Sequence, residues 1–126
     1  MKYVIQPKRN PQDDKAPKKF YLVAKSVGNI TFKEIAREIE KRSSLTRGDI
    51  ENVLTNLAEV LPLFLRNGFT VSLDDFCSVH LTIQSDGADT EEEAGPHLVR
   101  QVRAVFVSGT ELKKELKDMP VEKFPE

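Results

Sequence analysis

This sequence has few residues that could bind a metal ion or form a disulfide, and it has no long apolar run. It has one cysteine, Cys77, and two histidines, His80 and His97. A single cysteine excludes an internal disulfide, and this set is too small for a multi-cysteine or histidine-rich zinc site. No apolar run approaches the roughly 20 residues that a membrane-spanning helix needs, and the start, MKYVIQPK, lacks the apolar core of a signal peptide. We therefore expect no cofactor, no membrane partner and a cytoplasmic location.

Positive charge is missing from the middle of the chain. Residues 67–99 contain no lysine or arginine and carry seven acidic residues, whereas residues 1–25 contain seven basic residues and two acidic ones. The whole chain has a formal net charge of −1. A basic segment in such a chain can still offer a surface to a polyanion, although a net-acidic protein is a weaker nucleic-acid candidate. Solvated faces with no target are the alternative explanation.

The remaining composition is typical of one folded domain. Of the 126 residues, 39% are hydrophobic and 31% are charged, which is too apolar for a disordered tail. A chain of this length can bury roughly two-thirds of its unfolded surface in a single core. We expect a soluble, folded protein.

The first half of the chain carries strand signals and then helix signals. β-branched and aromatic residues predict a two-stranded hairpin from 2–6 and 20–25, joined by a long polar loop. Thr31 and Glu34 then form a capping box that predicts a helix ending near Ser43.

A longer amphipathic helix follows at once. Thr46 and Asp49 form a second capping box, and Asn67-Gly68 supplies a left-handed stop. Pro62 lies inside this helix and predicts a bend, since it cannot donate to the carbonyl of the previous turn. The apolar positions recur at helical spacing and predict a core or dimer seam; they are Ile50, Val53, Leu54, Leu57, Ala58, Leu61, Phe64 and Leu65.

Alternating apolar and polar residues then predict a three-stranded sheet. Its strands are 69–73, 76–84 and 98–107, with a turn at Asp74-Asp75 between the first two. Residues 85–96 are polar and acidic, and they predict an exposed loop or a projecting arm.

The end of the chain predicts a short helix and a frayed tail. Ser108 and Glu111 bracket a third capping box, and the helix that it opens runs to about Asp118. Residues 119–126 are expected to fray. The predicted organisation is an N-terminal β-hairpin extension at 1–29, a main domain at 30–118 and a flexible tail at 119–126.

Three motifs occur in this order with compatible spacing. They are FKEIA at 32–36 with SLT at 44–46, GFTVSLDDFCSV at 68–79, and FVSGTELK at 106–113. Together with the order of elements over roughly 30–118, they resemble the HU/IHF family of bacterial histone-like DNA-binding proteins. The added N-terminal segment and the acidic connection look like the longer HU-related subfamily.

The resemblance implies an α+β fold of HU/IHF type. An N-terminal αα-hairpin would lie over a three-stranded antiparallel sheet with a β-arm and a short C-terminal helix, and an extra N-terminal β-hairpin would be added. In the family, two chains intertwine and two β-arms reach into the minor groove of double-stranded DNA. They contact phosphates and insert an apolar wedge, so little base sequence is read. The resemblance therefore implies a homodimeric, non-sequence-specific DNA-binding protein of the bacterial nucleoid, and no enzyme.

Carried over by position, the resemblance also implies a set of phosphate-facing residues. Ser78 would lie by the DNA backbone at the saddle, and Lys113 would face phosphate at a helix N-terminus with two backbone amides. The basic N-terminal segment adds a flank that has no local counter-charge. The predicted DNA-binding residues are Lys18, Lys19, Ser78, Arg100, Arg103, Gly109, Thr110 and Lys113.

The sequence departs from the family in the arm. Family arms are basic and carry an Arg-Asn-Pro tip, whereas residues 86–96 here contain no basic residue, so phosphate would repel this stretch. Cys77 and Val79 replace a glycine and an aromatic residue, and Val107-Ser108 stand where Arg/Lys-Pro is usual. Pro96 could act as the wedge, although a Gly-Pro turn is the simpler explanation.

These departures leave a second hypothesis open. In it the chain keeps the dimer fold, has lost DNA binding, and uses Glu91–Glu93 of the acidic arm to bind a basic protein partner. An enzyme is the least supported class. Cys77 and His80 are three residues apart on a predicted strand and therefore point to opposite faces, and a tight turn accounts for Asp74-Asp75.

Overall fold

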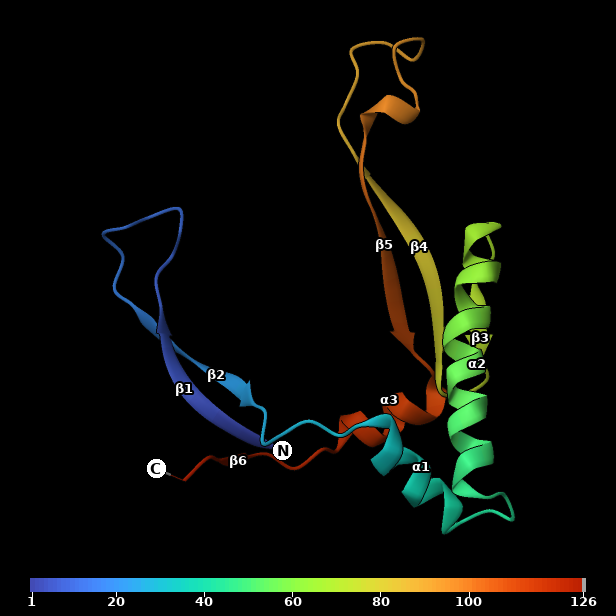
Figure 1. The fold of residues 1–126 in the computed structure, drawn as a ribbon. Coiled ribbons are helices and arrows are strands. Elements are labelled where there is room, and N and C mark those ends of the chain that lie inside the picture. Colours follow the sequence, from blue (N-terminus) through green and yellow to red (C-terminus); the bar gives the residue numbers. More distant parts are fainter. Residues whose placement is uncertain (126) are drawn as a thin grey trace. The chain divides into compact units, whose positions relative to one another are not determined.

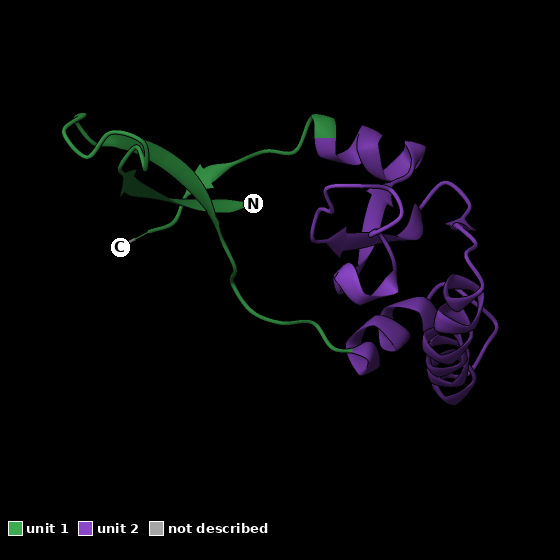
Figure 2. Cartoon of the chain, turned by 90° about the horizontal axis from the view of Figure 1, so that it is seen from above, with its two compact units in different colours: residues 1–31, 117–126 green, residues 32–116 purple. Residues whose placement is uncertain are grey.

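The computed structural model describes residues 1–125, and these form two compact units, coloured separately in Figure 2. Unit 1 consists of Met1–Thr31 together with the segment from Lys117 onwards, and unit 2 is Phe32–Leu116. The C-terminal segment therefore joins the N-terminal unit, in place of the separate tail expected at 119–126. Three helices and two sheets make up the fold, so the predicted α+β class is confirmed.

Unit 1 is a small sheet with the strand order β2-β1-β6 (Figure 1). β1 (Lys2–Lys8) pairs antiparallel with β2 (Lys19–Lys25), and we refer to this pair as the β1–β2 ribbon. β6 (Glu122–Lys123) pairs parallel with the other edge of β1. These strands form a sheet of their own and do not extend the sheet of unit 2.

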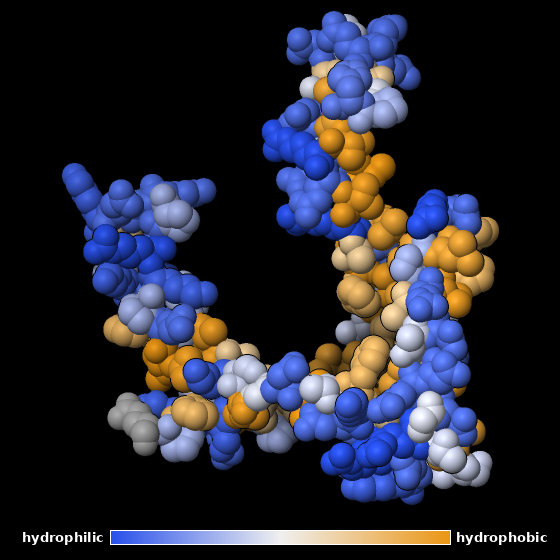
Figure 3. Space-filling view, in the orientation of Figure 1, coloured by the Kyte–Doolittle hydropathy of each residue, from blue (hydrophilic) through white to orange (hydrophobic). Residues whose placement is uncertain are grey.

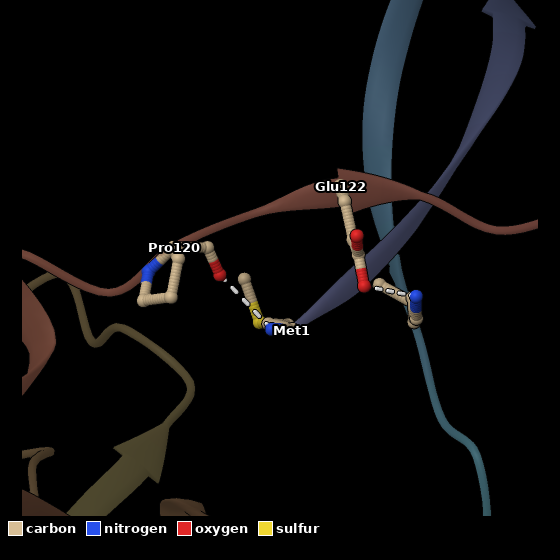
Figure 4. Close-up of polar contacts among 4 residues, drawn as sticks. Met1, Pro120 and Glu122 are labelled. Atoms are coloured by element: carbon tan, nitrogen blue, oxygen red, sulfur yellow. Dashed lines mark hydrogen bonds and ion pairs between the residues drawn. The ribbon is translucent and has the colours of Figure 1, made fainter.

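The tail that was expected to fray is held against β1. The amide of Glu122 donates to the carbonyl of Met1 at 3.0 Å, and that of Phe124 donates to Tyr3 at 2.8 Å. The N-terminal ammonium donates to the Pro120 carbonyl at 2.9 Å, and the Glu122 carboxylate pairs with Lys2, as Figure 4 shows. The expectation of a free tail was therefore wrong, because a two-residue strand has no periodicity by which a sequence could reveal it.

Unit 2 begins with two helices. α1 (Phe32–Glu40) starts directly after Thr31, and α2 (Arg47–Arg66) follows a short link. The predicted second capping box is present: the Thr46 hydroxyl accepts from the Asp49 amide at 3.1 Å, and the Asp49 carboxylate accepts from the Thr46 amide at 3.4 Å. α2 runs without interruption through Pro62. Gly68, with φ of +87°, then ends it, and its amide donates to Leu65 at 3.0 Å.

The sheet of unit 2 has the antiparallel order β3-β4-β5. Its strands are β3 (Val71–Leu73), β4 (Cys77–Ser85) and β5 (Val99–Ser108), and a 3₁₀ turn, η1 (Pro96–Leu98), precedes β5. β4 and β5 form a long two-stranded ribbon that extends beyond β3 (Figure 1). We refer to it as the β4–β5 ribbon.

The last helix, α3 (Thr110–Lys117), does not begin with the predicted capping box. The amide of Gly109 donates to the carbonyl of Phe76 at 2.8 Å, and that of Glu111 donates to Asp75 at 3.3 Å. Carbonyl groups of the turn between β3 and β4 therefore accept the hydrogen bonds of the amides at the start of α3. A capping box relates residues three apart in sequence and cannot reveal such a distant cap.

The core of unit 2 is small. The buried apolar residues are Ala36, Ile50, Leu65, Cys77 and Val79. Many other apolar side chains of α2 and the sheet remain exposed, among them Phe106 at 68%. An exposed apolar surface of this kind in a folded unit marks an interaction site.

Candidate nucleic-acid interface

The β4–β5 ribbon has an apolar face and a polar face. Residues that lie opposite one another in an antiparallel pair project from the same side of the sheet. Val79 lies opposite Phe106, and Ile83 lies opposite Val102, on the apolar face. Ser78, His80 and Thr82 lie on the other face. Figure 3 shows apolar residues along one side of the ribbon and hydrophilic ones at its tip.

Two predicted residues share the polar face. Ser78 is half-buried and lies opposite Val107, and Arg103 is exposed and lies opposite Thr82. Thr82, which marks the position of Arg103 on β4, is four residues from Ser78. Ser78 and Thr82 are therefore about 13 Å apart along the strand. Among residues 1–125, the Arg103 guanidinium makes only a long hydrogen bond, 3.4 Å from its Nε to Gln101 Oε1. This face can therefore offer a hydroxyl and a cation to the same polyanion.

Arg100 lies farther out, at the register shift opposite Gln84/Ser85, and is ion-paired with Asp86. Its side chain is 63% exposed and that of Asp86 is 47% exposed. Exposed ion pairs of this type contribute little to stability. A phosphate could thus compete with Asp86 for this guanidinium.

The start of α3 carries three further predicted residues. Thr110 and Lys113 are exposed, which leaves the Lys113 ammonium accessible to an anion. Gly109 differs, because its amide is bound to the Phe76 carbonyl. The expectation that the Gly109 amide faces phosphate was therefore wrong: the amide serves to hold α3 to the β3–β4 turn.

The tip of the ribbon is acidic. The loop at 86–95 carries five carboxylates, and within residues 1–125 only Asp86 among them has an ion-pair partner. Uncompensated carboxylates repel phosphate at short range and are screened by salt. The tip is accordingly the part of the ribbon least suited to DNA.

The remaining predicted residues, Lys18 and Lys19, belong to unit 1. Lys19 is the first residue of β2 and lies opposite Lys8, while Lys18 precedes it in the loop. Both are exposed. Sequence reasoning placed Lys8 in the basic N-terminal segment, either a phosphate-contacting flank or a solvated loop, but did not select it among the DNA-binding residues. The register of the β1–β2 ribbon, which would have paired it with Lys19, could have revealed it.

Sequence reasoning did not locate an apolar groove that lies in unit 2. Its volume is ≈ 410 Å³, and its lining is almost wholly apolar. Leu54, Leu57 and Leu61 of α2 form one wall, and Val79 and Phe106 of the sheet form another. The helical spacing of the leucines had indicated a core or dimer seam. It could not show that the sheet leaves this seam uncovered.

Other chemistry has little support in the described part of the chain. Cys77 is buried on the apolar face of β4 and His80 lies on the opposite face, so the two do not form a catalytic pair. Among residues 1–125, no group of three potential metal-ligating side chains comes together. No helix in that range is long and apolar enough to cross a membrane.

Two solved structures are among those with a similar fold. A candidate DNA-binding protein from Bacteroides vulgatus ATCC 8482 matches with a TM-score of 0.62 and 18% identity, covering 98% of this chain and 49% of that one. This chain thus spans about half the length of that protein. HU from Anabaena, in a cocrystal with DNA, matches with a TM-score of 0.53 and 18% identity, over 72% of this chain and 100% of that one.

No curated protein matches the sequence. A family profile does match, over residues 1–123, and the family is described as an HU domain fused to a wHTH, Ig or glycine-rich motif. The match includes both units, so the HU resemblance of the sequence motifs is confirmed. The chain belongs to the HU-HIG family of HU-domain proteins.

Proposed function

We propose that this protein is a bacterial nucleoid-associated protein, which binds double-stranded DNA as an HU-like dimer without sequence specificity. The observation that carries the proposal is the open apolar groove of unit 2 in a chain of the HU-HIG family. A groove lined by α2 and the sheet would be covered if a second copy packed against it, because closed two-fold association buries the same patch on both chains. Such a dimer would present two β4–β5 ribbons as arms.

The DNA contacts in this proposal are electrostatic. Unit 2 would contact the DNA phosphates through Ser78, Arg103 and Lys113, and through Thr110 at the start of α3. Arg100 would join them by exchanging Asp86 for a phosphate. Lys18 and Lys19 would add a flank from unit 1. Contacts of this kind position a protein on DNA but carry no base information.

The test is fluorescence anisotropy of a labelled duplex of about 30 base pairs, titrated with the full chain at several salt concentrations. We expect saturable binding in which log K falls by about 0.9 per phosphate contact for each decade of salt. Changing Lys18 and Lys19 together to Glu should weaken binding and flatten the salt slope. The absence of binding at low salt would overturn the proposal.

A second function is favoured by the acidic tip. Four carboxylates at 86–95 lack an ion-pair partner among the described residues, and they could instead bind a basic protein. In this case the dimer would be a scaffold without DNA affinity. Reversing the charges of Glu91–Glu93 would then abolish capture of a basic partner, whereas it should strengthen DNA binding if the first proposal holds.

A further inference from the structure

A second cavity lies at the loop end of the β1–β2 ribbon. It has a volume of ≈ 390 Å³ and lies wholly within unit 1. Three cationic side chains line it, those of Lys8, Arg9 and Lys19, together with Tyr21 and a short stretch of the loop. This volume is within the range of about 300–1,000 Å³ typical of small-ligand pockets.

The register of the ribbon concentrates the positive charge in this pocket. Lys8 and Lys19 lie directly opposite one another, so both project from the face that also carries Tyr21. Like charges in opposed positions of a β-pair destabilise it. The Lys8 ammonium lies 5.7 Å from the centroid of the Tyr21 ring, and this contact leaves its charge without a counter-charge.

The other end of the same ribbon shows how such a pair is compensated. Lys2 and Lys25 also lie opposite one another. There, however, Lys2 is paired with the Glu122 carboxylate, and Lys25 lies 5.9 Å from the Phe124 ring. At the loop end, Lys8, Arg9 and Lys19 have no ion pair with any carboxylate of residues 1–125. The nearby Asp13 instead accepts the Lys15 amide, at 3.0 Å.

We propose that this pocket binds the phosphate group of a phosphate ester, with Lys8 and Lys19 on either side and Arg9 as a third cation. A phosphate supplies the ion-pair partner that these three cations lack among residues 1–125, and it accepts several charge-assisted hydrogen bonds at once. The planar guanidinium of Arg9 suits two phosphate oxygens. The phosphate could belong to the DNA backbone, in which case the inference rests on the proposed function, or to a free nucleotide, in which case it does not.

The test follows the amides of Lys8, Arg9 and Lys19 in the full chain by NMR. Inorganic phosphate, deoxyadenosine monophosphate and the duplex are titrated in turn. We expect saturable shifts confined to the pocket. Lys8→Glu should weaken phosphate and nucleotide binding by about tenfold, the loss expected for one charged contact. This variant should fold at least as well as the wild type, because it replaces a like-charge cross-strand pair with an opposite-charge pair.

Lys15→Glu is the matched control. It makes the same change of charge in the same loop but lies outside the pocket lining, so it should leave the pocket shifts and the affinity close to wild type. Equal weakening by Lys8→Glu and Lys15→Glu would overturn the proposal, since general charge alone would then account for binding. The absence of saturable shifts with all three ligands would overturn it as well.

The two sources of phosphate give different results. If the pocket holds a DNA phosphate, the duplex shifts the three amides and Lys8→Glu lowers its salt slope by about 0.9. If it holds a free ester, the mononucleotide saturates the pocket while the duplex leaves these amides unchanged. A wild-type protein that binds the mononucleotide but no duplex would contradict the proposed function and support the pocket.

Discussion

At the scale of single residues, Gly109 marks a close approach between the start of α3 and the β3–β4 turn. A Cβ atom at this position would overlap the backbone of Asp75 and would lie 2.8 Å from the Phe76 carbonyl carbon. The backbone comes this near because the Gly109 amide donates to Phe76. Glycine is thus required at position 109, because there is no room for a side chain. Any side chain would force α3 away from the β3–β4 turn.

Gly109→Ala should therefore destabilise unit 2. We expect a loss of about 1–3 kcal/mol in the free energy of unfolding, the usual cost of overpacking a tight contact. Urea denaturation followed by circular dichroism measures it. Gly87→Ala is the control, because nothing lies within 4 Å of a Cβ at that position. Equal midpoints for the two variants would contradict this account of Gly109.

At the scale of elements, β6 is the shortest strand and depends on side-chain contacts. Besides its ladder with β1, the strand is held by the pair between Glu122 and Lys2. The hydrogen bond from Lys2, followed by its positive charge, lowers the pKa of the Glu122 carboxyl. A carboxyl whose pKa is lowered by folding stabilises the folded form above its unfolded pKa, and this contribution disappears as the pH falls through the folded value.

The attachment of β6 should accordingly weaken in acid. Hydrogen exchange of the Phe124 amide, which donates to Tyr3, reports this attachment directly. We expect its protection, corrected for intrinsic exchange, to be constant near neutral pH and to fall at acid pH. Glu122→Gln should have the lower protection near neutral pH, match the wild type in acid and lose this pH dependence. Unchanged protection of the wild type across the range would contradict the role of the ion pair.

The helices and long strands were predictable because each carries its own periodic signal. The capping box at Thr46 and the stop at Gly68 marked the ends of α2 correctly, since both are local. α3 was predicted, but the contacts that hold its start were missed, as was β6, because both depend on distant partners. β6 needs the edge of β1, and the start of α3 needs the carbonyls of Asp75 and Phe76.

The candidate site divides in the same way. The placement of Ser78 and Arg103 on one face follows from strand alternation, which a sequence displays. The engagement of Arg100 by Asp86 and of the Gly109 amide by Phe76 could not be foreseen, because neither pairing follows a repeat. The sequence showed Lys8 as part of a basic segment, but its position opposite Lys19 depends on the register of the β1–β2 ribbon.

At the scale of the whole molecule, unit 2 lacks a cover for its apolar groove. Phe106 is 68% exposed and lines the groove together with Leu57 of α2, which is 39% exposed. Few monomeric proteins leave large contiguous apolar surfaces in water. The proposed dimer would remove these side chains from solvent. Association of this kind stabilises the folded form, because the partner binds the folded chain and not the unfolded one.

Phe106→Glu should therefore convert the proposed dimer into a monomer. Light scattering coupled to gel filtration should give twice the chain mass of 14.3 kDa for the wild type and the chain mass for the variant. The variant should also lose DNA affinity, because the two arms would no longer act together. Leu63→Glu is the control: Leu63 is 53% exposed on α2 but does not line the groove. A wild-type monomer at micromolar concentration would contradict the dimer.

The pairing of β6 with β1 also fixes an order of events during folding. Lys2 and Glu122 are 120 residues apart in sequence, so their ladder closes a very long loop for few hydrogen bonds, and contacts of that kind form late. During synthesis β1 leaves the ribosome long before β6 exists. Until then the β1–β2 ribbon has an open edge, which is a template for wrong pairing with other chains. Newly made molecules should thus be most vulnerable to aggregation in the interval before β6 is made.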